Sequence, residues 1–250
     1  MIQVNVFWTA GLDSTCRIVE LASSEGYDIQ PYYLLDEKRR SHGIELRRIA
    51  SMTELIRSNP ATRSRLRDIL VVNLKEINID PGIVESWKPA HTKYSLGRQY
   101  YWIASFLRER GLVAEISLEK GEYGATLAIN SECSKRIEGL GNYRVYRVEP
   151  ERSTKTGRDL FENLAMPLSI WNLTKQEEAA MIKDLGYEEV FELTWFCHKP
   201  IFGLPCGHCH PCQSVRKEGM GWRIPVWGRI LYWPLNPFIN LYYSLKRRLH

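Results

Sequence analysis

The sequence predicts an α/β protein built on a parallel sheet, and three observations support this fold class. Short apolar runs alternate with longer segments that carry helix signals, the order expected when helices cover both faces of a parallel sheet. The chain has 250 residues, of which 44% are hydrophobic and 25% charged, so it can bury a large core. Its first apolar run ends in a turn of small residues, at the kind of position where such sheets bind ligands.

The expected strands are four short apolar runs bounded by polar or turn residues. They cover residues 2–8, 29–35, 68–74 and 113–119. The expected helices cover residues 13–25, 44–58 and 100–111, and Gly111 closes the last of them.

A further helix is expected after Thr174. Thr174 and Glu177 have the spacing of a capping box, and Gly186 stands where that helix would end. Residues 120–165, by contrast, are rich in Gly, Ser, Arg and Glu and show little periodicity. We therefore expect loops there, over the ligand-binding edge of the sheet.

Composition narrows the classes of partner. The net charge of +5, without a dense Lys/Arg run, permits an anionic substrate but is not typical of a nucleic-acid-binding arm, so no nucleic-acid partner is expected. The first apolar segment lacks the features of a signal peptide, which predicts a cytoplasmic protein. In that compartment six cysteines favour metal binding or chemistry over disulfides.

The turn after the first apolar run, VFWTAGLDST (residues 6–15), has the composition of a phosphate site. Gly11 lets the backbone approach a ligand closely, and the amides that open the next helix can donate to phosphate oxygens. The hydroxyls of Thr9, Ser14 and Thr15 can donate as well. Asp13 suits a magnesium ion that bridges the phosphates. The alternative is an ordinary turn in which Asp13 or Ser14 caps the helix.

The stretch CHKPIFGLPCGHCHPC (residues 197–212) predicts a structural zinc site. Four cysteines in sixteen residues can supply a tetrahedral, fully thiolate site with no open position. Its ligands are Cys197, Cys206, Cys209 and Cys212. Because four sulfurs saturate zinc, the histidines among them (His198, His208 and His210) are expected not to bind it. A redox role or an iron–sulfur cluster is the alternative.

These motifs together resemble one family. Thr9-Ala10-Gly11-Leu12-Asp13-Ser14 is similar to the Ser-Gly-Gly-x-Asp-Ser loop of the N-type ATP pyrophosphatases, with Thr for the first Ser and Ala10 for the first Gly. That loop and this cysteine spacing occur together in the 7-cyano-7-deazaguanine synthase family. The resemblance covers about residues 1–219.

Segments between the two motifs carry the same resemblance more loosely. Asp36 follows the second expected strand, and the residues after it resemble the family's Asp-Tyr-Gly-Gln-x-His stretch. Those residues are Arg39, Arg40, His42 and Glu45. Leu96-Gly97-Arg98-Gln99 resembles its Pro-Gly-Arg-Asn motif, and MPLSIWNLTKQE (residues 166–177) its Thr-Pro-Leu segment.

The resemblance implies a Rossmann-like fold of the adenine nucleotide alpha hydrolase type. It divides the chain into an ATP-binding α/β domain (residues 1–165), a helical zinc region (166–219) and an aromatic, basic tail (220–250). The implied reaction is ATP-dependent adenylation of 7-carboxy-7-deazaguanine, followed by attack of ammonia to give the amide and then the nitrile. ATP, Mg²⁺ and Zn²⁺ are the implied cofactors.

The resemblance also suggests residue roles. The implied catalytic residues are Asp13, Ser14 and Arg98. The implied nucleotide-binding residues are Thr9, Ala10, Gly11, Leu12, Asp13, Ser14, Thr15 and Asp36. Lys93 and Lys120 are the next candidates after Arg98 for balancing the charge on the transferring phosphorus. Glu119, Glu122 or Glu132 is a candidate for accepting hydrogen bonds from the guanine-like edge of the substrate.

The tail includes an uncharged stretch, residues 230–245, between Arg229 and Lys246-Arg247-Arg248. It is too short and too interrupted by proline to span a bilayer, so we expect it to pack on the fold or across a homodimer interface. A surface for a partner protein is the next alternative, followed by binding to a membrane surface.

Three other functions stay open at this point. A diverged relative can stop at the amide, or transfer the activated deazaguanine to a protein amine, as in antiphage systems. A tRNA-modifying or thiolating enzyme would share the loop, but the chain lacks a basic RNA-binding face. A zinc-stabilised, catalytically silent nucleotide-binding scaffold would explain the departure at Ala10.

Overall fold

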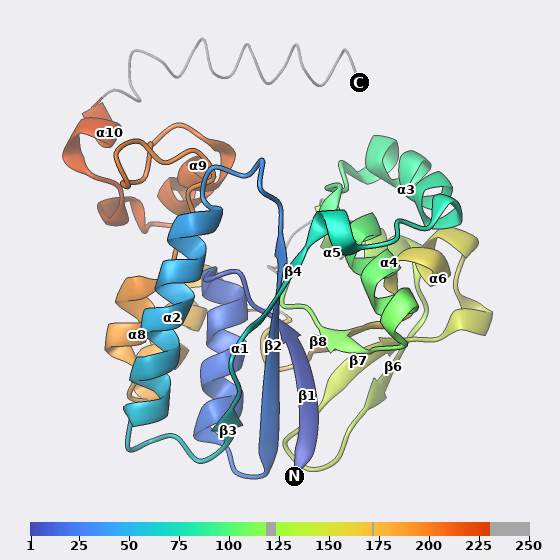
Figure 1. Ribbon diagram of the computed structural model, residues 1–250, viewed down its shortest axis with the longest axis horizontal. Helices are drawn as coiled ribbons and strands as arrows, with labels where there is room; N and C mark the ends of the chain where they lie inside the picture. Colours follow the sequence, from blue (N-terminus) through green and yellow to red (C-terminus); the bar gives the residue numbers. More distant parts are fainter. Residues whose placement is uncertain (119–123, 172, 231–250) are drawn as a thin grey trace.

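The computed structural model describes residues 1–118, 124–171 and 173–230, and these residues form an α/β fold around one mostly parallel sheet (Figure 1). The strand order is β3-β2-β1-β5-β8-β7-β6, and β4 also pairs with β2. The strands are β1 (Ile2–Phe7), β2 (Tyr27–Leu35), β3 (Arg65–Leu66), β4 (Leu70–Asn73), β5 (Ala114–Glu115), β6 (Lys135–Glu138), β7 (Val145–Val148) and β8 (Leu164–Pro167). The predicted α/β class with a parallel sheet is thus confirmed for β1 to β5 and β8, which pair in parallel.

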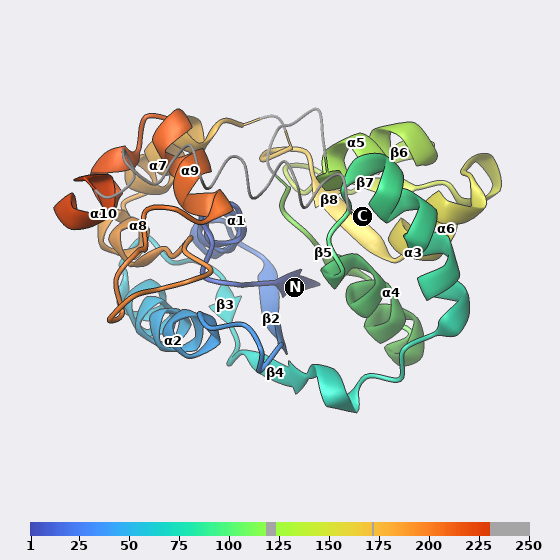
Figure 2. The ribbon, with the colours of Figure 1, turned by 90° about the horizontal axis from the view of Figure 1, so that it is seen from above.

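Helices cover both faces of this sheet (Figures 1 and 2). The α-helices are α1 (Leu12–Ser23), α2 (His42–Ser58), α3 (Pro81–Tyr94), α4 (Gln99–Arg110), α5 (Gly124–Glu132), α6 (Lys155–Phe161), α7 (Lys175–Asp184), α8 (Glu188–Leu193), α9 (His210–Lys217) and α10 (Val226–Ile230). The short 3₁₀ turns are η1 (Leu74–Glu76), η2 (Pro150–Arg152) and η3 (Gly221–Arg223). Helices α1, α2 and α8 lie on one side of the sheet, and α3 to α6 lie on the other.

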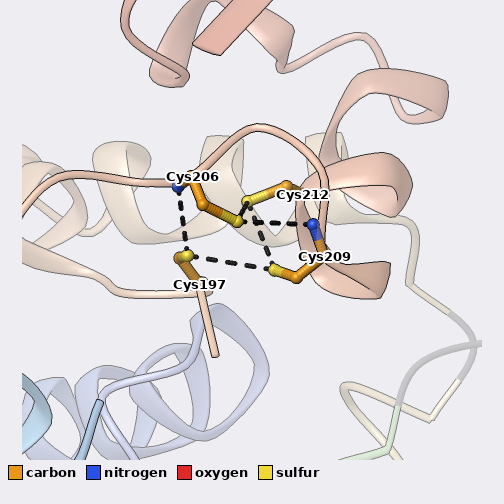
Figure 3. A group of neighbouring side chains, drawn as sticks. All are labelled: Cys197, Cys206, Cys209 and Cys212. Carbon is orange, nitrogen blue, oxygen red and sulfur yellow. Dashed lines mark hydrogen bonds between the residues drawn. The ribbon is translucent and has the colours of Figure 1, made fainter. Parts of the chain in front are cut away.

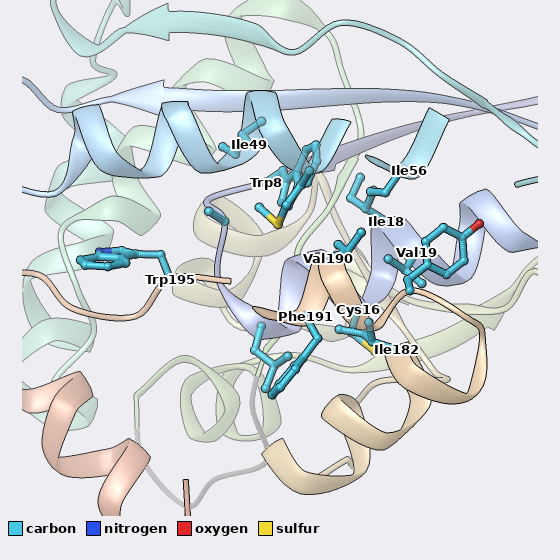
Figure 4. Packing of buried hydrophobic residues seen from close by; sticks show 14 of the residues in the cluster. Trp8, Cys16, Ile18, Val19, Ile49, Ile56, Ile182, Val190, Phe191 and Trp195 are labelled. Carbon is cyan, nitrogen blue, oxygen red and sulfur yellow. The ribbon is translucent and has the colours of Figure 1, made fainter. Parts of the chain in front are cut away.

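Each face of the sheet has its own core of buried apolar side chains. On the first face, Cys16 and Ile18 of α1 pack with Ile182 of α7 and Phe191 of α8 (Figure 4). Cys16 is fully buried there, as expected of a small residue on the first helix. This packing fixes the start of α1 against α7, and that pair of helices forms the candidate site described below.

The strand order changes direction between β1 and β5. From β1 the chain passes outward to β2, whereas β5 continues on the other side toward β8. Open α/β sheets bind ligands in the crevice outside the carboxyl ends of the strands at such a point. The small-residue turn that follows β1 therefore lies at the position where this fold favours a ligand.

The prediction of loops at residues 120–165 was wrong for the part that the structure describes. That part contains α5, β6, β7, α6 and the start of β8, and β6 pairs with β7 as an antiparallel hairpin. Gly139 has φ +123° at this hairpin, and a Cβ there would lie 1.9 Å from the Tyr143 carbonyl oxygen. Each of these elements is short and contains few apolar residues, so hydrophobic periodicity does not reveal them.

Other element boundaries also differ from the prediction. Helix α3 was missed, although Asp80 caps it with a carboxylate that accepts a 2.7 Å hydrogen bond from Gly82 N–H, and Pro81 opens it. Strand β5 is two residues long, where residues 113–119 were expected. The start of the tail forms η3 and α10, while the predictions for residues 231–250 lie outside the described residues. Among the described helices, none has the length and hydropathy needed to cross a bilayer.

Candidate functional site

The turn after β1 leaves helix α1 without a side-chain cap. Gly11 is the N-cap residue, and no side chain in residues 1–118, 124–171 or 173–230 accepts from the first backbone N–H groups. The first hydrogen bond into the helix joins Thr15 N–H to the Gly11 carbonyl, so the N–H groups just before it have no intrahelical acceptor. Ser14 Oγ lies 3.2 Å from the Gly11 oxygen and donates to it. The interpretation of Asp13 or Ser14 as an ordinary cap does not match this geometry.

Ala10 takes the backbone conformation that glycine favours. Its φ is +59°, in the left-handed region, and its side chain is fully buried in the core on the α1 side of the sheet. Its carbonyl oxygen accepts a 2.8 Å hydrogen bond from the backbone N–H of Trp195. The methyl group therefore points into the protein and does not lie on the exposed side of the loop.

The hydroxyls of the loop have different environments. Thr9 is exposed, and its backbone N–H lies 3.4 Å from Ser14 Oγ. Thr15 is fully buried, and its hydroxyl accepts a 2.9 Å hydrogen bond from the Trp8 indole. Thr9 is thus exposed at the turn, whereas Ser14 is buried and its hydroxyl stabilises the turn itself. The Thr15 hydroxyl holds the turn to the core.

Asp13, in the first turn of α1, forms an ion pair with Lys175, the first residue of α7. Lys175 Nζ also lies 3.4 Å from Glu178 Oε2. Burial lowers the pKa of Lys175, although Glu178 acts in the opposite direction. Burial likewise raises the pKa of Glu178 to about 7, with Lys175 opposing the shift. Sequence reasoning did not assign Lys175, because its partner Asp13 is 162 residues away.

The segment after β2 is organised around a buried carboxylate. Glu45 accepts hydrogen bonds from Tyr33 Oη at 2.8 Å and Ser41 Oγ at 2.7 Å, and pairs with Arg39 at 2.8 Å. Asp36 Oδ1 accepts from the backbone N–H of Lys38 at 3.0 Å, so it stabilises the turn that leads to α2. These contacts account for Asp36 and Glu45 without a ligand.

The other predicted site residues that the structure describes form no hydrogen bond or ion pair with the loop after β1. Arg98 is exposed at the N-cap of α4 and forms no ion pair with a residue in the described ranges. Lys93 lies 3.4 Å from Glu132, which also accepts from Tyr94 and, at 2.6 Å, from Thr154. Burial would raise the pKa of Glu132, but the hydrogen bonds from Thr154 and Tyr94 outweigh it and the pKa is lowered. Two predicted groups fall outside the described residues: the carboxylates Glu119 and Glu122, and Lys120.

The four predicted cysteines converge on one point (Figure 3). All four are buried, and their Sγ atoms lie within 4.8 Å of one another. Three of the separations are 3.5, 3.8 and 3.9 Å. Four thiolates about 2.3 Å from a tetrahedral zinc ion would lie about 3.8 Å apart, so the donor set and its spacing fit zinc. No other group of three or more potential ligands converges in this way within the described parts of the chain.

Backbone groups shape this cysteine cluster. The N–H groups of Cys206 and Cys209 each lie 3.3 Å from a cysteine sulfur, and such donors stabilise thiolates. Gly207 has φ +78°, and a Cβ there would lie 2.3 Å from the Gly228 carbonyl oxygen. Helix α10 therefore packs directly against the turn that follows Cys206. His208 contacts the Cys206 carbonyl oxygen at 3.0 Å instead of the sulfurs. The cluster of potential ligands contains the four cysteines alone, as expected.

Trp195 connects the cysteine cluster with the loop after β1. Its indole N–H donates to the Cys197 carbonyl oxygen at 2.7 Å, and its backbone N–H donates to Ala10 at 2.8 Å. Trp195 itself is buried in the same core as Ala10. Sequence reasoning missed this role, since nothing in the local pattern around Trp195 specifies contact with Ala10.

Neither a scan against models of known protein families nor a search of curated proteins gave a match to this chain.

Proposed function

We propose that the protein is an ATP-dependent ligase that adenylates a carboxylate, with 7-carboxy-7-deazaguanine as the substrate implied by the resemblance. The observation that supports this most directly is the uncapped start of α1 at the carboxyl end of β1. A helix N-terminus with free N–H groups favours a phosphate, and this one lies where the strand order reverses. The exposed Thr9 hydroxyl adds a donor at the same place, whereas the Ser14 hydroxyl donates to the Gly11 carbonyl oxygen.

The residues around the turn suit charge that develops during attack on the α-phosphate. As the Pα–O bond to the β-phosphate breaks, negative charge grows on the departing pyrophosphate, and preorganised N–H donors stabilise it. The Asp13 carboxylate is partly exposed beside these donors and has the oxygen chemistry that Mg²⁺ prefers. Bound there, Mg²⁺ would neutralise phosphate charge.

The proposed reaction proceeds in two ATP-consuming stages. In the first, a carboxylate oxygen of the substrate bonds to the α-phosphorus and pyrophosphate leaves, which gives an acyl adenylate. Ammonia then attacks the carbonyl carbon, loses a proton and displaces AMP to form the amide. In the second stage the amide oxygen bonds to the α-phosphorus of another ATP and pyrophosphate leaves. Loss of AMP, which carries away the amide oxygen, and of both N–H protons then gives the nitrile.

The cysteine cluster has a structural role in this proposal. Four thiolates fill the coordination sphere of zinc, so the metal would have no position for activating water. The hydrogen bonds of Trp195 to Cys197 and Ala10 place the cluster directly behind the loop. A loaded cluster would therefore hold the loop in the conformation that presents its N–H groups.

The test is a reaction of purified protein with ATP, Mg²⁺, ammonium and 7-carboxy-7-deazaguanine, followed by measurement of AMP, pyrophosphate and product mass. We expect AMP and pyrophosphate to form only with the deazaguanine present, together with a product at the mass of the nitrile. Equal AMP formation without the deazaguanine would remove the substrate assignment. An amide or a protein adduct would select the diverged relative, and no turnover would select the silent scaffold.

A further inference from the structure

A cavity of about 380 Å³ lies beside the amino-terminal half of β1, and the proposed reaction does not use it. Residues 3–5 of β1 form one wall, residues 111–113 between α4 and β5 form another, and Tyr143 contributes from the hairpin of β6 and β7. The loop expected to bind the nucleotide follows the opposite end of β1, away from the amino terminus marked in Figure 1. The volume is in the range of pockets that hold small molecules.

The cavity results from how β1 and β5 meet. The register pairs Val6 of β1 with Glu115, the second and last residue of β5. Toward the amino end a side chain joins the two segments in place of a ladder hydrogen bond, because Asn5 Nδ2 donates to the Val113 carbonyl oxygen at 2.9 Å. The two segments therefore leave a space between them that the fold itself maintains.

The cavity wall contains a hydrogen-bond acceptor without a donor. Asn5 Oδ1 is buried and has no hydrogen-bond partner in the described part of the chain. The orientation of this amide is fixed, since Nδ2 faces a carbonyl oxygen that can only accept. A buried acceptor left unpaired is unfavourable, so a ligand with an N–H group stabilises this wall. The exposed amide of Gln3 can both donate and accept beside it.

The charges at the cavity are already balanced within the protein. Glu115 is the charged side chain among the lining residues, and it accepts hydrogen bonds from Arg17 at 2.6 and 2.8 Å. The Arg17 guanidinium also lies 5.5 Å from the centre of the Tyr143 ring. A charged ligand would lose its hydration without gaining a free partner of opposite charge. Val4 and Leu112 add apolar lining, so the cavity favours a neutral ligand.

We propose that this cavity binds a neutral nucleobase-like heterocycle, with a ring N–H group donating to Asn5 Oδ1. Such a ring combines apolar faces, which suit Val4 and Leu112, with donors and acceptors confined to its edge, which suit Asn5 and Gln3. ATP, AMP and carboxylates are disfavoured by their charge. The inference is independent of the proposed function, because no residue of the loop after β1 takes part in it.

The experiment follows the side-chain amide signals of Asn5 and Gln3 in nuclear magnetic resonance spectra of ¹⁵N-labelled protein. Three probes are titrated: hypoxanthine, a neutral base with ring N–H groups; caffeine, a related ring system without N–H groups; and orotate, an anionic base. We expect hypoxanthine to shift both amide signals saturably. Caffeine and orotate should bind at least about tenfold more weakly, since one lacks the donor to Asn5 and the other carries an unbalanced charge.

A pair of matched variants tests the location. Val113→Phe places a larger side chain in the cavity wall, and Val71→Phe makes the same change on β4, at nearly equal exposure (42% and 44%). Val113→Phe should weaken hypoxanthine binding about tenfold or more, and Val71→Phe should not change it. Should Val113→Phe not fold, Asn5→Leu removes the acceptor and should cause a similar loss, about that of one hydrogen bond.

Three outcomes would overturn the inference. The first is hypoxanthine that leaves both amide signals unshifted up to its solubility limit. The second is a set of shifts confined to the loop after β1, which would place the base at the proposed active site and leave the proposed function intact. The third is caffeine binding as tightly as hypoxanthine, which would remove the role of Asn5. Absence of ATP turnover, by contrast, would end the proposed function and leave this cavity unaffected.

Discussion

The cysteine cluster and the loop after β1 are two sites built in opposite ways. All four cluster donors come from sixteen consecutive residues, are buried and point at one another. In the described part of the chain no side chain caps the N–H donors of the loop, and its neighbours Lys175 and Trp195 are distant from it in sequence. The difference suggests that the cluster serves the protein's own structure, while the loop is open to a ligand.

The largest effect is expected from Cys209→Ser. Closing a structural thiolate zinc site contributes on the order of 10 kcal/mol to folding, so losing one ligand should release the metal and unfold the segment around the cluster. Because Trp195 connects Cys197 to Ala10, the backbone amides of the loop should also lose protection from hydrogen exchange. The measured metal content should fall from about one ion per chain to none. Hydrogen exchange should rise around Trp195 and Ala10.

The matched control for this prediction is Cys133→Ser. Cys133 is half-buried after α5, outside the cluster, so its replacement should retain the metal. A metal-free Cys209→Ser protein with unchanged exchange would remove the structural role of the cluster and with it the contrast between the two sites.

Asp13→Ala should separate activity from stability. We expect pyrophosphate release to fall about 100-fold or more, since a group that organises the phosphates is lost. Stability should fall by about 1 to 2 kcal/mol, because the Asp13 side chain is 25% exposed but its removal takes one carboxylate from the 13% exposed Lys175, which Glu178 still contacts. A pyrophosphate assay and a thermal melt measure the two effects, with the exposed Asp184→Ala as control. Turnover equal to that of the control would show that Asp13 is not a catalytic residue.

The features that sequence predicted well are those determined by neighbouring residues. The capping box of Thr174 and Glu177 forms as expected, and Gly186 closes α7 with φ +86°. The cysteine cluster is of the same kind, since close spacing brings the ligands together whatever the rest of the fold does. The first strand and helix were also predicted to within two residues at each end, because a long apolar run and a helix start lie side by side.

The features that sequence missed depend on contacts between distant segments. The contacts of Lys175 with Asp13 and of Trp195 with Ala10 follow from how α7 and the cysteine segment pack against α1. The hairpin of β6 and β7 has the mixed sequences KRIE and VYRV, which show no clear alternation. Its place at the end of the sheet comes from pairing with β8, which a local pattern does not encode.

The stability of the fold should depend on pH through Glu178. Its folded pKa of about 7 lies above its ordinary value of 4.5, mainly because of burial, so the folded state binds the proton more tightly than the unfolded state. This contribution to stability is full below about pH 4.5 and is lost as the pH rises through about 7, at a cost of up to about 3 kcal/mol. Thermal melts at several pH values should show the decline, and Glu178→Gln should reduce it. An identical pH profile in Glu178→Gln would exclude Glu178 as its source.

The smallest expected effect comes from Ala10→Gly, and a neighbouring substitution sharpens it. Relief of the left-handed backbone at Ala10 contributes about 1 kcal/mol, and the greater freedom of glycine in the unfolded chain offsets most of it. Because the Ala10 methyl group is buried, ATP affinity should not change. Gly11→Ala should instead place a Cβ 3.4 Å from Thr9 Oγ1 and 3.9 Å from Ser14 Oγ, contacts that the fold tolerates.

That new methyl group would stand between the two hydroxyls expected to meet a phosphate. We therefore expect Gly11→Ala to fold normally but to bind ATP about tenfold more weakly, the loss of about one hydrogen bond, as measured by calorimetry beside Ala10→Gly. The opposite result, with affinity altered by Ala10→Gly and not by Gly11→Ala, would mean that the ligand meets the other side of the loop. Since the departure from the glycine-rich pattern is at Ala10, this pair also tests whether that departure affects nucleotide binding at all.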